Sequence, residues 1–352
     1  MKRILKKNFV IVMIGMVFLL TIVPTWLGWY DSYIQLVIQF IGINIILTVS
    51  LNLINGFMGE FNCGHAGFMG MGAYVASVIT VAFLVQDDVF GAPLVAEGWS
   101  FIIFPLSLLM GALGAALFGL LVAIPSFRTR GDYLAIITLA VNYIFKSSIE
   151  NIQLIGGARG FMGTSRVVKV MEGIVQVPWT MIFIFIATIL TIFLIHNFTK
   201  STFGKSVIAI REDEIASELM TINTRHVKVI AFMLACGLAG IAGGLYAHVI
   251  GYINPGGFTI LKSAEIMVMV YLGGMGSISG SVISAGGFTV ALELLKPLGL
   301  YRWVLMPLLL IAIMIFRPTG LMGNRELTDV FPKLKSFLST SGEAESHVLA
   351  AD

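Results

Sequence analysis

The residues closest to a catalytic motif are Gly204, Lys205 and Ser206, which match the end of a nucleotide-binding P-loop. The complete motif, GxxxxGK[ST], also requires a glycine at position 199, where this chain has Thr199. In addition, the stretch follows a long apolar segment, whereas a P-loop follows a β-strand of an α/β unit. We therefore expect no nucleotide site in this chain, so any ATP chemistry must come from another one.

Cysteine and histidine residues do not predict a metal or catalytic centre either. Cys63 and Cys236 are separated by most of the chain and lie in or beside apolar segments, which argues against a disulfide or a metal site. The five histidines show no metal-ligand spacing, and no Ser/His/Asp or Cys/His arrangement can be assigned. We expect no metal, no cofactor, no enzymatic activity and no nucleic-acid partner.

Polar residues inside apolar segments are the next candidates for function. Asn52, Asn55 and His65 need partners or water at membrane depth, and Glu265 lies just inside an apolar run. Nearby glycine clusters favour either close helix packing or helix breaks whose backbone lines a substrate path. Glu265 and a second acid, Glu293, have the further alternative of pairing with a lysine one turn away. The candidate path residues are Asn52, Asn55, Gly56, Gly64, His65, Glu265, Gly273, Gly274 and Gly276.

Residues 200–228, which we name the 200–228 loop, form a charged stretch between two long apolar segments. The loop holds five basic and four acidic residues, although only 12% of the whole chain is charged. Apolar residues at spacings of four and three predict a short amphipathic helix, with acids at its start near the positive end of the helix dipole. The residues concerned are Arg211, Glu212, Asp213, Glu214, Ile215, Ala216, Leu219 and Ile222.

The apolar face of this short helix needs either the membrane surface or a groove on a partner. Helices that lie on membranes usually carry Lys and Arg on their polar face, whereas this one carries mainly acids, which anionic lipid repels. The charge pattern therefore favours a partner in the water phase.

The surrounding elements must be membrane spans, because the chain has far more apolar material than one soluble core needs. Hydrophobic residues make up 57% of the 352 residues, and 38 are glycine. Apolar runs long enough to cross a bilayer predict an all-α, polytopic helical membrane protein with about ten transmembrane helices and glycine-broken segments. The predicted spans are 8–30, 33–54, 62–85, 101–124, 133–151, 179–198, 228–250, 261–278, 281–296 and 302–317.

Basic residues near the span ends predict the orientation, since cytoplasmic loops hold the excess of Lys and Arg. They place both termini and the 200–228 loop in the cytoplasm, and the loops at 86–100 and 152–178 outside. Arg159, Arg166 and Lys169 are basic residues on the outer side, where they would meet acidic residues of a docked protein. We expect one membrane domain over residues 1–325 and a polar cytoplasmic tail over 326–352.

Four segments resemble the permease subunits of branched-chain amino-acid ABC importers. They are LNLINGFMGEFNCGHAGFMGMGAYVAS at 51–77, RTRGDYLAIITLA at 128–140, GKSVIAIREDEIASELMTINTRHVKVIAFMLACGLAGIAGGLYA at 204–247 and MVYLGGMGSISGSVISA at 269–285. The resemblance covers nearly all of the membrane part in the same order. The RTRGDY segment and the long 152–178 loop are similar to the M-type subunit.

The resemblance implies the all-helical ABC importer permease fold in a bacterial or archaeal cytoplasmic (inner) membrane. It also implies a homologous second permease subunit, two ABC ATPase subunits and an extracytoplasmic substrate-binding protein that delivers an amino-acid substrate. Arg211 to Ile222 would correspond to the cytoplasmic coupling helix that enters a groove on the ATPase. Three alternatives stay open: a permease for urea or short-chain amides, an ion-coupled secondary transporter supported by Glu265 and Glu293, and a structural scaffold.

Overall fold

The computed structural model describes residues 21–86, 91–127 and 133–301, the positions 304, 308, 311, 315 and 316, and residues 319–323. Most of the predicted spans at 8–30 and 302–317 lies outside the described residues. So do residues 128–132 of the RTRGDY segment and the predicted tail at 326–352.

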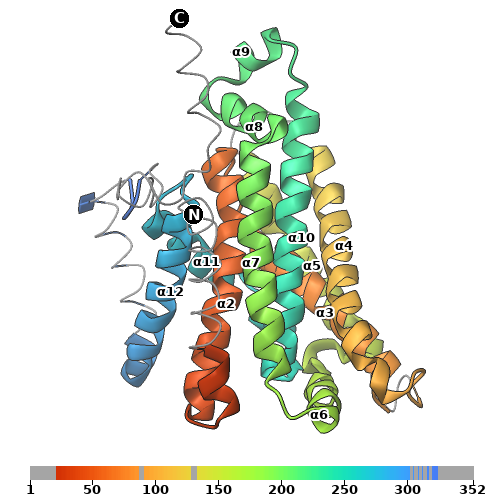
Figure 1. The fold of residues 1–352 in the computed structure, drawn as a ribbon. Coiled ribbons are helices and arrows are strands. Elements are labelled where there is room, and N and C mark those ends of the chain that lie inside the picture. The colour runs from red at the N-terminus through yellow and green to blue at the C-terminus, as the bar shows by residue number, and fades with distance from the viewer. Residues whose placement is uncertain are drawn as a thin grey trace, which may run out of the picture.

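Long helices lie side by side and form one bundle (Figure 1). They form because a long apolar segment can satisfy its backbone N–H and C=O groups within a membrane only as a helix. Each predicted span between 33 and 296 coincides with a helix whose ends are displaced by a few residues. The long helices are α2 (Ser32–Asn52), α3 (His65–Leu84), α4 (Ser100–Ser126), α5 (Tyr133–Asn151), α7 (Trp179–Lys200), α10 (Thr224–Ile250), α11 (Ile260–Gly273) and α12 (Ile278–Leu294).

Six segments of the described chain are long and apolar enough to cross a membrane. They are Ser32–Phe57, His65–Leu84, Glu97–Ser126, Trp179–Lys200, Thr224–Ile250 and Pro255–Gly273, and α12 is a shorter apolar helix. The all-helical membrane architecture is therefore confirmed, while the predicted number of ten spans is not.

Short elements lie at the two ends of the bundle. Helices α8 (Thr202–Glu212) and α9 (Glu214–Leu219) lie at one end, and α6 (Thr164–Ile174) lies at the other (Figure 1). Strand β1 (Phe161–Met162) pairs antiparallel with β2 (Tyr252–Ile253). Single turns connect the remaining helices: η2 (Glu97–Trp99), η3 (Gln153–Ile155), η4 (Gly157–Arg159), η5 (Pro255–Gly257) and η6 (Lys296–Tyr301).

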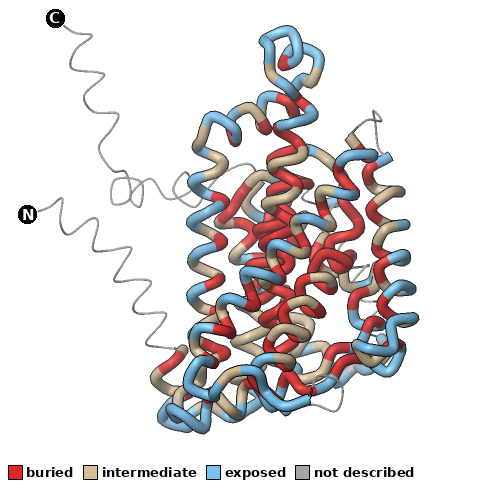
Figure 2. Tube along the Cα trace, turned by 90° about the vertical axis from the view of Figure 1, so that its right-hand side faces the viewer, coloured by how far each residue is buried: buried red, intermediate tan, exposed pale blue. Residues whose placement is uncertain are grey.

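The core is formed where α10 packs against α3 and α4, and the buried residues fill the centre of the bundle (Figure 2). Glycine makes this packing close. A Cβ atom added to Gly72 in α3 would lie 2.2 Å from Cα of Gly240 in α10. Likewise, a Cβ atom on Gly243 would lie 1.8 Å from the carbonyl oxygen of Met69. The packing interpretation of these glycines is therefore confirmed.

Two of the membrane helices are interrupted where the sequence is rich in glycine. Helix α2 runs into a π-helical turn, η1 (Leu53–Phe57), in which Met58 N donates to Leu53 O at 3.0 Å. Residues 58–64 then continue without helix until α3 begins at His65. The second break, residues 274–277, separates α11 from α12 and requires glycine, because φ is 109° at Gly274 and 84° at Gly276.

Candidate functional site

The predicted amphipathic helix of the 200–228 loop is present as α9, but it is shorter than expected. Arg211 and Glu212 belong to the end of the preceding helix α8. Asp213 has extended backbone, and its Oδ1 accepts a hydrogen bond from Ala216 N at 3.0 Å. This is the N-cap arrangement that aspartate favours, and it fixes the start of α9 at Glu214.

The predicted apolar face of this helix included Ile222, but α9 ends before that residue. The helix stops at Leu219, and Thr221 has a positive φ of 65°, which turns the chain away. Ile222 therefore does not continue the face of α9 and packs against the core of the bundle instead. The sequence pattern misplaced Ile222 because Ile222 follows Leu219 at helical spacing, whereas the backbone between these two residues is not helical.

Helix α9 presents an apolar surface that the described chain leaves uncovered. The exposed fractions are 65% for Ile215, 79% for Leu219 and 75% for Met220, and Ala216 is also exposed. The helix projects from the end of the bundle (Figures 1 and 2). Exposed apolar residues gathered on a projecting element are typical of a docking surface.

Two basic residues connect this end of the molecule to the break after α2. Arg211 Nη1 donates to Gly56 O at 2.9 Å, and its Nη2 lies 2.5 Å from Glu212 Oε1. Lys228, the fifth residue of α10, has its Nζ 2.8 Å from Glu60 Oε1 and 2.8 Å from Glu214 Oε1. The 200–228 loop is thus tied by charged groups to residues 56–60.

The two breaks are joined to each other by Asn52. Its Nδ2 donates to Ser277 O at 2.9 Å and to Ser281 Oγ at 2.8 Å, and its Oδ1 accepts from Gly276 N at 3.0 Å. Gly56 lies beside these groups, since a Cβ atom there would be 2.4 Å from Gly276 N. Three predicted path residues, Asn52, Gly56 and Gly276, are therefore in one place.

A second group of predicted path residues surrounds the start of α3. Asn62 N donates to Asn55 Oδ1 at 3.2 Å, and Gly64 N donates to Asn62 Oδ1 at 2.9 Å. His65 is fully buried and shares a hydrogen bond of 2.9 Å with Ser50 Oγ through Nε2. Within the part of the chain that the structure describes, Asn62 Nδ2 and His65 Nδ1 have no hydrogen-bond partner. Because Ser50 Oγ donates to Leu47 O, His65 Nε2 donates to Ser50 Oγ, and Nδ1 of the neutral ring is an acceptor. The Asn62 donor and the His65 acceptor leave polar capacity for water or another ligand in this region.

Gly273 and Gly274 form the end of α11, where residues from much later in the chain complete the hydrogen bonding. Leu321 N donates to Leu272 O at 2.8 Å, and Met322 N donates to Gly273 O at 3.1 Å. The carbonyl groups that a helix end leaves free are thus satisfied by a distant segment.

Glu265 is not part of either group. Glu265 Oε2 lies 3.0 Å from Lys262 Nζ, and the residue precedes Gly273 by about 12 Å of helix at 1.5 Å per residue. Glu293 is similarly paired, with its Oε1 2.6 Å from Lys296 Nζ. The alternative in which both acids pair with a lysine one turn away is confirmed.

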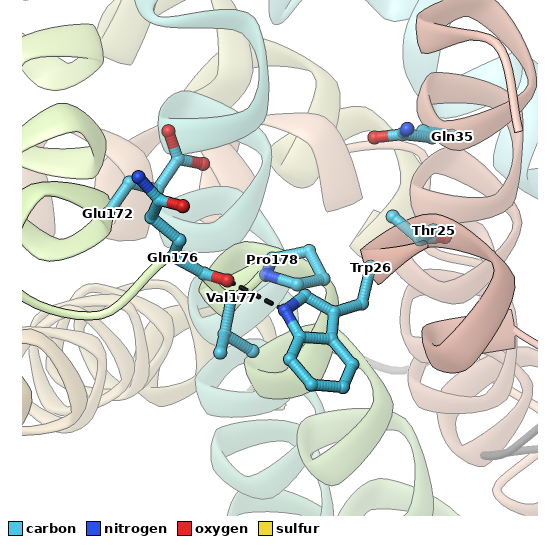
Figure 3. Close-up of a pocket in the computed structure, with 7 residues that line it drawn as sticks. All are labelled: Thr25, Trp26, Gln35, Glu172, Gln176, Val177 and Pro178. Atoms are coloured by element: carbon cyan, nitrogen blue, oxygen red, sulfur yellow. Dashed lines mark hydrogen bonds between the residues drawn. The ribbon is translucent and has the colours of Figure 1, made fainter. Parts of the chain in front are cut away.

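The predicted docking residues Arg159, Arg166 and Lys169 are all exposed, in η4 and α6, at the end of the bundle opposite α9. Arg166 Nη1 donates to Gln86 O at 3.0 Å. A cavity of about 240 Å³ opens near α6 (Figure 3). Trp26 Nε1 donates to Gln176 O at 2.9 Å at its edge. The cavity is lined by Thr25, Trp26, Gln35, Glu172, Gln176, Val177 and Pro178.

Three residues of the site were not identified from the sequence. They are Lys228, which bridges two acids, Glu60, which is one of those acids, and Ser281, which binds Asn52. Lys228 was recognised only as one base of the loop. The sequence signal was a lysine directly before the long apolar part of a helix, because such a residue needs an acidic partner when it is buried. The sequence does not indicate which acids those are.

Known proteins match most of the chain. Residues 33–317 match the family model described as "Branched-chain amino acid transport system / permease component". The chain is 31% identical to the high-affinity branched-chain amino acid transport system permease protein LivM of Escherichia coli K12, over 80% of this chain and 68% of that protein. It is 25% identical to LivH of Salmonella typhimurium, over 81% and 92%. It is 22% identical to the probable LivM of Methanocaldococcus jannaschii, over 88% and 99%. No solved structure gives a significant match.

Proposed function

This chain belongs to the branched-chain amino acid transport permease family, and we propose that it is the permease subunit of an ATP-driven importer for leucine, isoleucine and valine. As a family member with six apolar helices long enough to span, it is a multi-pass inner-membrane protein. The relatives include both LivM and LivH permeases, which supports a homologous second permease subunit as partner.

The observation that carries the proposal is the uncovered apolar surface of α9. In the proposed complex, Ile215, Leu219 and Met220 enter a groove on one of two ATPase subunits, which supply the ATP hydrolysis. ATPase closure then moves α9 and reorients the spans around a path at the interface with the second permease. Asn52, Gly56 and Gly276 lie at the helix breaks proposed to border that path.

A substrate-binding protein is proposed to deliver the amino acid at the opposite end of the bundle. The exposed Arg159, Arg166 and Lys169 provide a basic surface there for acidic residues of that protein.

Uptake into proteoliposomes tests the proposed function. The two permeases and the ATPase, with binding protein and ATP, should accumulate labelled leucine, while this chain alone with an ion gradient should not. Uptake by the single chain without ATP would establish the secondary transporter instead. Competition by urea or acetamide, with no effect of leucine, would assign the transporter to amides.

Substitution of the α9 surface tests the docking step. We expect I215S/L219S to lose co-purification of the ATPase and to lose uptake with it, because the apolar contact is removed. The matched control is L154S, which changes a leucine of similar exposure, 62%, in η3 at the other end of the bundle. If the double variant still retains the ATPase, α9 is not the docking element.

A further inference from the structure

We propose that Lys228 is a positioning residue that transmits movement of α9 to the break in α2, through the carboxylates of Glu214 and Glu60. The inference rests on the proposed function, because it assumes that an ATPase moves α9. It goes further by naming the group through which that movement enters the membrane helices.

The geometry places Lys228 where three segments meet. Glu214 is the first residue of α9, Lys228 is the fifth residue of α10, and Glu60 follows the π-helical turn η1. Both carboxylates lie 2.8 Å from the same ammonium nitrogen, and the lysine side chain is only 9% exposed. Without the cation, the half-exposed carboxylate of Glu214 and the less exposed carboxylate of Glu60 would lie near each other without a countercharge and repel. Lys228 therefore links the first residue of α9 to Glu60 in the stretch after α2.

A second contact also joins the 200–228 loop to the segment after α2. Arg211, at the end of α8, donates to Gly56 O at 2.9 Å. Its side chain lies against Gly59, where an added Cβ atom would be 2.5 Å from Arg211 Cγ. The 200–228 loop thus contacts the residues after α2 twice, once through a guanidinium and once through an ammonium group.

The segment that receives these contacts is suited to a change of shape. It consists of a π-helical turn and a non-helical stretch with φ of 76° at Gly59, so its backbone is not fixed by a regular helix ladder. Asn52, immediately before it, bonds to Gly276, Ser277 and Ser281 at the second break. Displacement of Glu60 by Lys228 would therefore reach both breaks through direct contacts.

The test measures leucine transported per ATP hydrolysed by the complete reconstituted complex. We expect K228M to retain the ATPase but to lower this ratio about tenfold, within the usual size of coupling effects between sites. E60Q leaves Lys228 paired with Glu214 and should lower the ratio roughly threefold. K228R keeps the cation and should retain most of the wild-type ratio.

The matched control is K205M, which removes an exposed lysine of the same loop in α8 and should leave the ratio unchanged. A wild-type ratio in both K228M and E60Q, with the ATPase still bound, would overturn the inference. So would a loss in K228R as large as that in K228M. If K228M does not fold, a wild-type ratio in E60Q is by itself enough to overturn the inference. Failure of the proposed function is separate, because the wild-type complex would then not transport leucine at all.

Discussion

At the scale of single residues, Asn52 is the side chain that most clearly links distant parts of the chain. It is 1% exposed and uses both ends of its amide, as donor to Ser277 O and Ser281 Oγ and as acceptor from Gly276 N. No other residue type of similar size combines these donors and that acceptor. Asn52 therefore fixes the position of one helix break against the other.

We expect N52L to destabilise the purified protein by about 1–3 kcal/mol, because it leaves Gly276 N without its acceptor and removes the amide donor to Ser277 O and Ser281 Oγ. The control is N44L in the same helix, where Asn44 Nδ2 donates a hydrogen bond of 2.8 Å to Thr289 Oγ1. Thermal unfolding in detergent measures both variants. Equal decreases of Tm in the two variants would show that the hydrogen bonds of Asn52 at the helix break stabilise the protein no more than the bond of Asn44.

At the scale of elements, the packing of α10 against α3 depends on glycines whose added Cβ atoms would collide with backbone. Gly243 and Gly237 lie on the same helix and differ in this respect. A Cβ atom on Gly243 would be 1.8 Å from Met69 O, whereas one on Gly237 would be 3.4 Å from Ala112 O, which is an ordinary contact.

The pair G243A and G237A tests this packing directly. G243A should cost about 1–3 kcal/mol, because α3 and α10 must separate to admit the methyl group. G237A should be neutral or slightly stabilising, since alanine is the better helix former by about 1 kcal/mol. Tm values of the two proteins give the comparison, and a stable G243A variant would contradict the close approach.

The sequence predicted the helices well and their tertiary partners poorly. Apolar runs are long and strongly marked, so α2, α4, α7 and α10 were found within a few residues. By contrast, the pairing of Lys228 with Glu60 and Glu214 depends on how three segments far apart in sequence meet. The spacing of residues along one helix carries no information on contacts between segments far apart in sequence. For the same reason, the pattern could not show that Ile222 leaves the face of α9 and packs against the core.

At the scale of the whole molecule, two different surfaces lie at opposite ends of the bundle. Helices α9 and α6 lie at these two ends (Figure 1). The end with α9 carries exposed apolar residues on a projecting helix, and the end with α6 carries the exposed bases Arg159, Arg166 and Lys169 besides exposed apolar residues such as Leu154. An apolar helix suits a persistent contact, whereas exposed charges mainly affect the rate of encounter. This difference fits a resident ATPase at one end and a transient binding protein at the other.

Neutralising the three basic residues, as R159Q/R166Q/K169Q, should weaken binding-protein docking by roughly threefold to 150-fold at physiological salt, from about 0.2–1 kcal/mol for each of the three charges. The measurement is the binding-protein concentration that half-stimulates ATP hydrolysis. Hydrolysis without binding protein serves as the control and should not change. High salt should remove most of the difference from wild type, because exposed charges are then screened. Unchanged stimulation at low salt would exclude these residues from docking.

The exposure of α9 also bears on the life of the chain in the cell. Ile215, Leu219 and Met220 project into water as long as nothing covers them. Chaperones and proteases recognise apolar side chains of this kind on damaged proteins. In a copy synthesised in excess of its partners, these apolar side chains would stay exposed. In an assembled copy, the docked partner would cover them. If the proposed docking of α9 and Met220 on the ATPase holds, the exposure of these side chains would therefore differ between unassembled and assembled copies.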